Sequence, residues 1–157
     1  MNPPGSLTVH APLPGKLVQL AEVPDPVFAQ GMVGYGAALE PVASEDLVTV
    51  VAPVSGRMLK VMPHAFVVQA PSGQGVLVHL GIDTVKLEGD GFTVHVAKGD
   101  QVSAGDPLVD MDLTTVRAAG LSACCPVIVL DSAADAITPL TAAEDITAGQ
   151  DLFAVFQ

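Results

Sequence analysis

The sequence predicts an all-β fold of many short strands, and two observations carry this prediction. From residue 9 onwards, short runs rich in Val, Leu and Ala alternate with Gly, Pro, Asp and Ser. The chain holds 15 glycines and 13 prolines and shows almost no 3.6-residue periodicity, which argues against long helices. Its 157 residues suffice for one domain with a substantial core. We therefore expect a single domain over residues 9–157, preceded by a loose end over residues 1–8.

Two short turn-bearing patterns each occur twice along the chain. The stretch Ala11–Gly15 reads APLPG and Ala52–Gly56 reads APVSG. Further on, Val102–Gly105 reads VSAG and Ile146–Gly149 reads ITAG. Two copies of each unit predict an internally duplicated motif, with two similar β-layers packed face to face.

Helical structure is expected only as short turns, around residues 113–120 and 132–136. The neighbouring cysteines Cys124 and Cys125 suit neither a zinc site nor an ordinary disulfide. We interpret them as two small hydrophobic residues of a buried strand, in a chain that works in a reducing compartment.

The charge balance narrows the classes of partner. The chain carries 17 acidic against 6 basic residues, for a net charge of −11. This argues against nucleic-acid phosphates and anionic membranes as partners and favours association with a basic protein surface, although acidity is often only a device for solubility. No stretch has the 18 or so apolar residues of a membrane span, and the first residues do not resemble a signal peptide. We therefore expect a cytoplasmic protein.

The stretch from Val76 to Leu87 is an apolar run with one imidazole, His79, in its middle. A strand of Val and Leu is a poor place for a histidine without a role. Gly81 predicts a bend that turns Asp83 back towards His79.

A second apolar run with a histidine precedes it, from Pro63 to Ala70. Between the two runs, Ala70-Pro71-Ser72-Gly73 has the pattern of a β-turn. If Ala70 and Gly73 are the outer residues of this turn, His64 lies directly opposite His79 on one face of a hairpin. A G1 bulge at Gly73 would shift this register by one residue. Two adjacent imidazoles on an apolar hairpin indicate a function rather than packing.

A neutral imidazole is a competent nucleophile near pH 7 and forms a phosphohistidine when it attacks a phosphoryl group. A second imidazole beside it would hydrogen-bond the incoming phosphoryl oxygens. We expect a carboxylate at Asp83 to meet the basic group of a donor protein. Apolar walls that keep water from the site are expected from Phe66, Leu77, Val78 and Leu80.

Zinc is the competing chemistry. His79 and Asp83 fit the H-x-x-x-D element of lysostaphin-like metallopeptidases, whose sites need a third protein ligand from an H-x-H element. Residue 93, two positions before His95, is threonine, so this element is absent. A zinc ion between His64 and His79, completed by a partner's carboxylate, remains open. His10 and His95 lack a motif and are interpreted as structural.

A swinging-arm carrier is a further alternative, because residues 100–108 resemble the turn and strand start of biotinyl and lipoyl domains. Such a domain needs an exposed lysine about ten residues beyond the glycine at position 105. The segment that follows, residues 109–115, contains no lysine. This reading is therefore disfavoured.

Taken together, the motifs resemble the glucose-type enzyme IIA of the bacterial phosphoenolpyruvate-dependent sugar phosphotransferase system, over nearly the whole chain from Val9. The most specific match is the sequence VHLGIDTV at Val78–Val85. Supporting matches are Pro24–Ala29, Val33-Gly34 with Gly36, Ala52-Pro53 with Gly56, His64–Phe66, Leu87, Gly89, Gly91-Phe92 and Pro126–Val129.

The resemblance implies a flattened antiparallel β-sandwich, with the two histidines in a shallow apolar depression. It implies that His79 is phosphorylated by the phosphocarrier protein HPr, that His64 supports it, and that the acceptor is a cysteine on the IIB domain of a sugar permease. No cofactor is required. The residues it assigns to partner contact and local charge are Asp25, Phe28, Val33, Tyr35 and Asp83, and those it assigns to support of the site are Gly81 and Thr84.

Two departures from the family pattern keep a third reading open, that of a regulatory module with reduced transfer. The family's threonine two residues before the first histidine is Met62 here, and the segment before His64 is two residues shorter. Tyr35 stands where the family has an aspartate, which changes the rim of the site.

Overall fold

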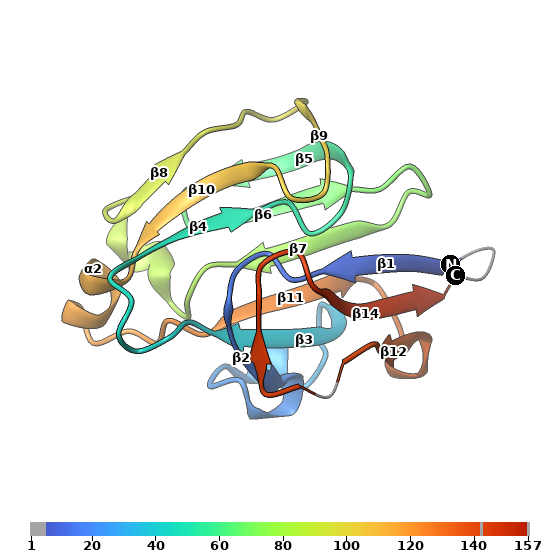
Figure 1. The fold of residues 1–157 in the computed structure, drawn as a ribbon, viewed down its shortest axis with the longest axis horizontal. Helices are drawn as coiled ribbons and strands as arrows, with labels where there is room; N and C mark the ends of the chain where they lie inside the picture. Colours follow the sequence, from blue (N-terminus) through green and yellow to red (C-terminus); the bar gives the residue numbers. More distant parts are fainter. Residues whose placement is uncertain (1–5, 142, 157) are drawn as a thin grey trace.

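A computed structural model describes residues 6–141 and 143–156. An eight-stranded sheet curls across one side of the molecule, and two three-stranded sheets lie against it (Figure 1). The paired strands are antiparallel throughout these described sheets. The predicted all-β sandwich is thereby confirmed.

The eight-stranded sheet has β11 and β7 at its centre. Its order is β13 (Asp145–Ile146), β2 (Gly15–Gln19), β3 (Gly34–Glu40), β11 (Cys125–Leu130), β7 (Gly75–His79), β6 (Ala65–Gln69), β5 (Gly56–Met62) and β9 (Gln101–Val102). One small sheet is β1 (Ser6–His10), β14 (Asp151–Phe156) and β12 (Ile137–Pro139), and the other is β4 (Leu47–Val51), β10 (Pro107–Asp112) and β8 (Phe92–Val94).

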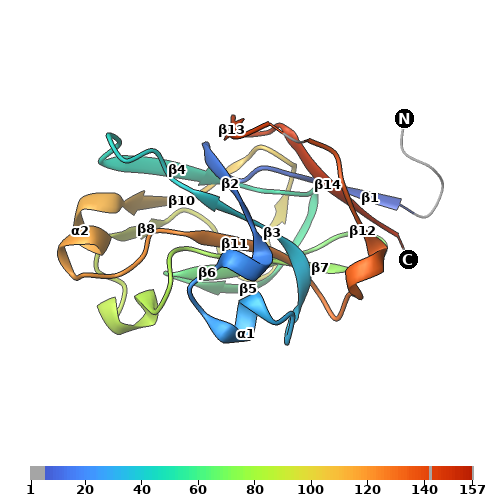
Figure 2. The same ribbon diagram turned by 90° about the horizontal axis from the view of Figure 1, so that it is seen from below.

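Helical segments are short. Those at α2 (Leu113–Ala118) and η3 (Ala134–Ala136) were predicted from the sequence, whereas η1 (Leu20–Glu22), α1 (Pro26–Ala29) and η2 (Thr84–Leu87) were not. Seen from below, α1 lies on the outer side of the eight-stranded sheet, away from the two small sheets (Figure 2). This is the side on which the candidate site is found.

The repeated stretches make equivalent backbone hydrogen bonds, as duplication predicts, but the two layers are not similar, because one is an eight-stranded sheet and the other consists of two three-stranded sheets. The two APxxG stretches run past each other, with His10 N donating to Pro53 O at 2.8 Å and Val51 N donating to Pro12 O at 2.7 Å. Each stretch also binds one of the two later turns, because Ala11 N donates to Gln150 O and Ala52 N donates to Asp106 O. The turn bound by Ala11 contains the ITAG pattern, and the turn bound by Ala52 contains the VSAG pattern.

The last glycine of each stretch is fixed by a close backbone approach. A Cβ atom on Gly15 would lie 2.3 Å from the carbonyl oxygen of Glu40, and one on Gly56 would lie 2.1 Å from that of Gln69. Only glycine fits where the two chain segments cross at this distance.

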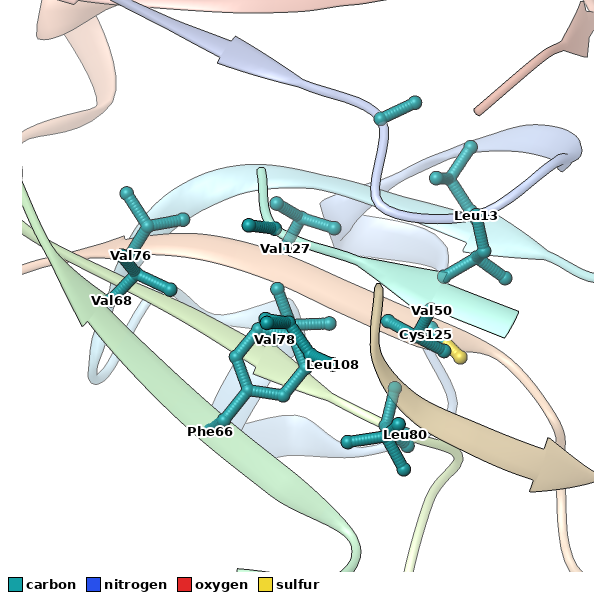
Figure 3. Close-up of a cluster of buried hydrophobic side chains, with 14 of the residues drawn as sticks. Leu13, Val50, Phe66, Val68, Val76, Val78, Leu80, Leu108, Cys125 and Val127 are labelled. Atoms are coloured by element: carbon teal, nitrogen blue, oxygen red, sulfur yellow. The ribbon is translucent and has the colours of Figure 1, made fainter. Parts of the chain in front are cut away.

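The main core fills the space between the large sheet and the two small ones (Figure 3). Along β7, Val76 and Val78 point into it, and because side chains alternate, Leu77 and His79 point to the outer face. The expected apolar wall of the site is therefore partly wrong. Phe66, Val78 and Leu80 are fully buried in the main core, and only Leu77 lies on the histidine face.

A second, smaller cluster covers this outer face. It consists of Leu20, Val23, Phe28, Ala38, Ile82, Cys124 and Ile128, with Val18, Val33, Tyr35 and Leu77 packed against it. Cys124 and Cys125 are buried and free, as predicted, but only Cys125 lies in the buried strand β11, and Cys124 directly precedes it. Burial raises the pKa of both thiols, that of Cys124 to about 12. Both thiols are thus held in the protonated, unreactive form.

The expected loose end over residues 1–8 is wrong for residues 6–8. They belong to β1 and pair with β14, with Leu7 opposite Val155, because Leu7 packs against the main core. Residues 1–5 lie outside the described part of the chain. Among the described helices, none is long and apolar enough to cross a membrane.

Candidate functional site

The β6–β7 hairpin carries one histidine of the site and places the other beside it. At its turn, Gly73 N donates to Ala70 O at 2.9 Å and Ala70 N donates to Gln74 O at 2.8 Å. Gly73 has φ +95°, the conformation of a G1 bulge residue. The extra residue in the turn shifts the register by one, so Ala65 rather than His64 lies opposite His79. The predicted direct pairing is wrong.

The predicted contact between the two imidazoles is nevertheless present. The ring centroids of His64 and His79 are 5.3 Å apart, in an edge-to-face arrangement. His64 lies in the turn between β5 and β6, before the regular strand begins, so strand alternation does not dictate its direction. Its backbone stays in the sheet pattern, because its carbonyl accepts a hydrogen bond of 2.7 Å from Leu80 N.

The ring of His79 is oriented by the bend that follows it. Gly81 has φ +83°, as expected for a bend, and its carbonyl oxygen lies 2.5 Å from Nδ1 of His79. Because a carbonyl oxygen only accepts, Nδ1 carries the proton and Nε2 keeps its lone pair. The ring nitrogen of His79 that is free to act as a nucleophile is therefore Nε2.

The ring of Phe28 packs against the ring of His79. Its ring centroid lies 5.2 Å from that of His79 with the planes tilted by 54°. The short helix that carries it begins with Asp25-Pro26, where the Asp25 carboxylate caps Val27 N at 2.9 Å and Pro26 suits the first helical turn. The contact between Phe28 and His79 thus depends on a helix that Asp25 caps, whereas contact of Phe28 with a partner protein stays a prediction.

Burial sets the charge state of both histidines. Desolvation lowers the pKa of His79, opposed by the Gly81 hydrogen bond and by the charges of Asp25 and Asp83. Desolvation also lowers the pKa of His64, and the neighbouring His79 lowers it further. Both imidazoles are therefore neutral at pH 7, and Asp25 and Asp83 are close enough to act on His79.

Exposed apolar side chains on the segments that follow Asp25 and Asp83 are taken as the rim of the site. Val27, Met32 and Val85 have exposed fractions of 42%, 68% and 59%. Val27 belongs to α1, Met32 to the segment after α1, and Val85 to η2. The helices α1 and η2 are too short to be predicted from sequence periodicity. Asp25-Pro26, a capping residue followed by proline, was the available signal for α1.

Val33 and Tyr35 pack against the second cluster, to which Phe28 belongs. The ring of Tyr35 lies so close to Gly31 that a Cβ atom there would be 2.2 Å from it. The side chain at the departure from the family pattern therefore fills space beside α1.

Thr84 is the one fully buried polar side chain among the described residues, and its hydroxyl donates to Leu80 O at 2.7 Å. His10 and His95 instead pair with carboxylates, Asp151 at 3.0 Å and Asp110 at 2.8 Å. Within residues 6–141 and 143–156, no three His, Cys, Asp or Glu side chains are grouped to hold a metal.

Comparisons with known proteins show the family to which the chain belongs. The profile of the family described as "phosphoenolpyruvate-dependent sugar phosphotransferase system, EIIA 1" matches residues 7–134. The "PTS system glucose-specific EIIA component" of Halalkalibacterium halodurans is 42% identical over 144 residues, which cover 90% of this chain and 81% of that protein.

Some relatives are longer proteins. The "PTS system mannose-specific EIIBCA component" of Corynebacterium glutamicum is 45% identical over 127 residues, which cover 80% of this chain and 18% of that protein. Among solved structures, the glucose permease IIA of Mycoplasma capricolum superimposes with a TM-score of 0.83 at 35% identity and covers 95% of each chain. The chain therefore belongs to the EIIA 1 family and is a phosphotransfer component of the phosphoenolpyruvate-dependent sugar phosphotransferase system.

Proposed function

We propose that His79 is the phosphorylated residue of a cytoplasmic carrier, which accepts its phosphoryl group from HPr and passes it to a cysteine of a permease IIB domain. In the first step, the bond from phosphorus to the donor breaks as a bond from phosphorus to Nε2 of His79 forms. In the second, this P–N bond breaks as the cysteine thiolate attacks and a P–S bond forms. His64 donates a hydrogen bond to the phosphoryl oxygens during both steps.

The single observation that carries this proposal is the hydrogen bond between Nδ1 of His79 and the Gly81 carbonyl. It leaves Nε2 unprotonated, and the lowered pKa of His79 keeps it so at neutral pH. A nucleophile needs this free lone pair. Phe28 shields the ring and limits hydrolysis of the P–N bond by water.

The surroundings of His79 suit a partner with a basic face. Asp25 and Asp83 lie beside the ring, within an exposed apolar rim, in a chain of net charge −11. Apolar contact gives such a complex its affinity, and complementary charge speeds its formation. Relatives named EIIBCA join the IIA, IIB and IIC components in one protein, which supports a IIB acceptor.

The test is intact-mass spectrometry after incubation with phosphoenolpyruvate, enzyme I and HPr. We expect one acid-labile phosphoryl adduct on the wild-type chain and none on His79→Gln. His95→Gln is the matched control, because His95 is a surface histidine paired with Asp110, and it should be phosphorylated normally. A normal adduct on His79→Gln would refute the assignment of the site.

A zinc-binding regulatory role is the alternative. This chain offers two imidazoles at the site, and a zinc ion there would need a carboxylate and a further ligand from a partner. If the wild-type chain takes up no phosphate from an active HPr, calorimetric titration with Zn²⁺ of the wild type and of His64→Gln would decide whether this role applies.

A further inference from the structure

The peptide between Gly81 and Ile82 joins His79 to a distant part of the chain. On one side its carbonyl oxygen accepts the Nδ1 proton of His79. On the other side its N–H, at Ile82, donates to the carbonyl oxygen of Ser122 at 2.9 Å. The C=O and N–H of a planar trans peptide point in opposite directions, so these two bonds hold one plane from both sides. Ser122 belongs to the segment between α2 and β11.

The side chain of Thr84 binds the neighbouring peptide, between Leu80 and Gly81, from the buried side. Its hydroxyl donates to Leu80 O at 2.7 Å, and the whole side chain is buried. Its methyl group also occupies the space next to Gly81, where a Cβ atom would lie 2.6 Å from Cγ2 of Thr84 and 2.9 Å from Ser122 O. Thr84 and Ser122 thus enclose the backbone at Gly81 so closely that no side chain fits there.

We infer that Thr84 and the Ser122 carbonyl are positioning groups for phosphotransfer, which hold the Gly81 carbonyl in place and thereby fix the tautomer of His79. The inference rests on the proposed function of His79. Hydrogen bonds in series polarise one another, so the bond at Ile82 N–H strengthens the accepting power of the Gly81 carbonyl. Thr84 acts through this carbonyl and does not touch the reacting atoms.

The test compares Thr84→Val, Thr84→Ala and Thr84→Ser. Valine keeps the shape of threonine but cannot donate to Leu80 O, alanine removes the donor without adding bulk, and serine keeps the donor. The readouts are the ¹⁵N NMR shifts of the His79 ring, which distinguish Nδ1–H from Nε2–H, and the single-turnover rate of phosphoryl uptake from HPr.

We expect wild type and Thr84→Ser to show the Nδ1–H tautomer alone. Thr84→Val and Thr84→Ala should show a mixture of tautomers and take up phosphate about tenfold more slowly, the lower end of the losses seen when an outer partner that orients a histidine is removed. A wild-type ring spectrum and rate in both the valine and alanine variants would overturn the inference.

Gly81→Ala gives a second test, since its Cβ atom must push Thr84 or Ser122 aside. Gly149→Ala is the matched control, with nearly the same positive φ, +86° against +83°, and nothing within 4 Å of the added atom. Only Gly81→Ala should change the His79 tautomer, and equal spectra would overturn the inference. If no variant, wild type included, is phosphorylated while the ring spectra change as expected, the positioning stands and the proposed function fails.

Discussion

His64 and His79 share one site although they are not opposite each other in the β6–β7 ladder. Their ring centroids are 5.3 Å apart, yet the cross-strand partner of His79 is Ala65. The position of the His64 ring therefore depends on the turn before β6 and on the bond from Leu80 N to its carbonyl. The His64 ring is thus positioned by contacts other than the cross-strand pairing of His79.

This independence predicts that His64 can be removed without losing the acceptor. His64→Ala should still take up a phosphoryl group on His79, but transfer to the IIB domain should slow by about a hundredfold, because a hydrogen-bond donor to the phosphoryl oxygens is lost. Quench-flow measurement of both half-reactions separates the two steps. Unchanged onward transfer would show that His64 does not assist it.

Asp25 has two roles that substitution can separate, as the cap of α1 and as a negative charge near His79. Asp25→Asn keeps a good capping residue but removes the charge. We expect a further drop in the pKa of His79, because Asp25 raises it, and a higher KM for HPr with weaker dependence on salt.

Asp25→Ala should show these effects and also lose about 1 kcal/mol of stability, because Val27 N is left without its partner. NMR titration of His79, steady-state kinetics at several salt concentrations, and urea unfolding measure the three quantities. If Asp25→Asn behaved as Asp25→Ala in unfolding, the capping role assigned to the Asp25 side chain would be wrong.

The lowered pKa values of His64 and His79 predict how activity and stability depend on pH. Both lie below the reference of 6.5, so the folded chain binds fewer protons than the unfolded chain between that value and the folded pKa. Stability is then complete above about pH 6.5, falls as the pH drops through this window, and levels off below the folded pKa.

Phosphoryl uptake should follow the same groups, with its acid-side midpoint below 6.5, because only neutral His79 is a nucleophile. A pH–rate profile of single-turnover uptake and an NMR titration of both rings test this. Midpoints at or above 6.5 would show that burial does not control these histidines.

The contact between His64 and His79 could be predicted from the sequence, but the strand register and the direction of the neighbouring side chains depend on local geometry. The turn at Ala70–Gly73 was recognised, yet the register depends on whether the glycine adds a bulge, which the four residues alone leave open. The alternation of β7 was predictable: His79 and Leu77 share a face, so Val78 had to point into the core. Strand alternation therefore excludes Val78 from the apolar wall around His79 and leaves Leu77 in it.

Other parts of the site were set by contacts between distant segments. The Ser122 carbonyl reaches the Gly81–Ile82 peptide from the segment before β11, and no local pattern marks a backbone group for such a contact. The duplication, in contrast, was visible because a close crossing of two chain segments demands glycine in both copies, at Gly15 and Gly56.

Because two chain segments cross closely at Gly56, we expect Gly56→Ala to destabilise the fold, although the backbone conformation of Gly56 suits alanine. The added Cβ atom would lie 2.1 Å from Gln69 O, a backbone atom of β6 that cannot rotate away, so the strands must separate. We expect a loss of about 2–4 kcal/mol in the free energy of unfolding.

Gly75→Ala is the matched control, a glycine of the same sheet whose added Cβ atom would first meet Cγ1 of Val67 at 3.3 Å, a side-chain atom able to shift. Its unfolding free energy should change by less than about 1 kcal/mol. Urea unfolding of the two variants measures the difference. Equal stability would mean that β5 and β6 can separate at Gly56 without cost, and the glycine in the two repeats would then need another explanation.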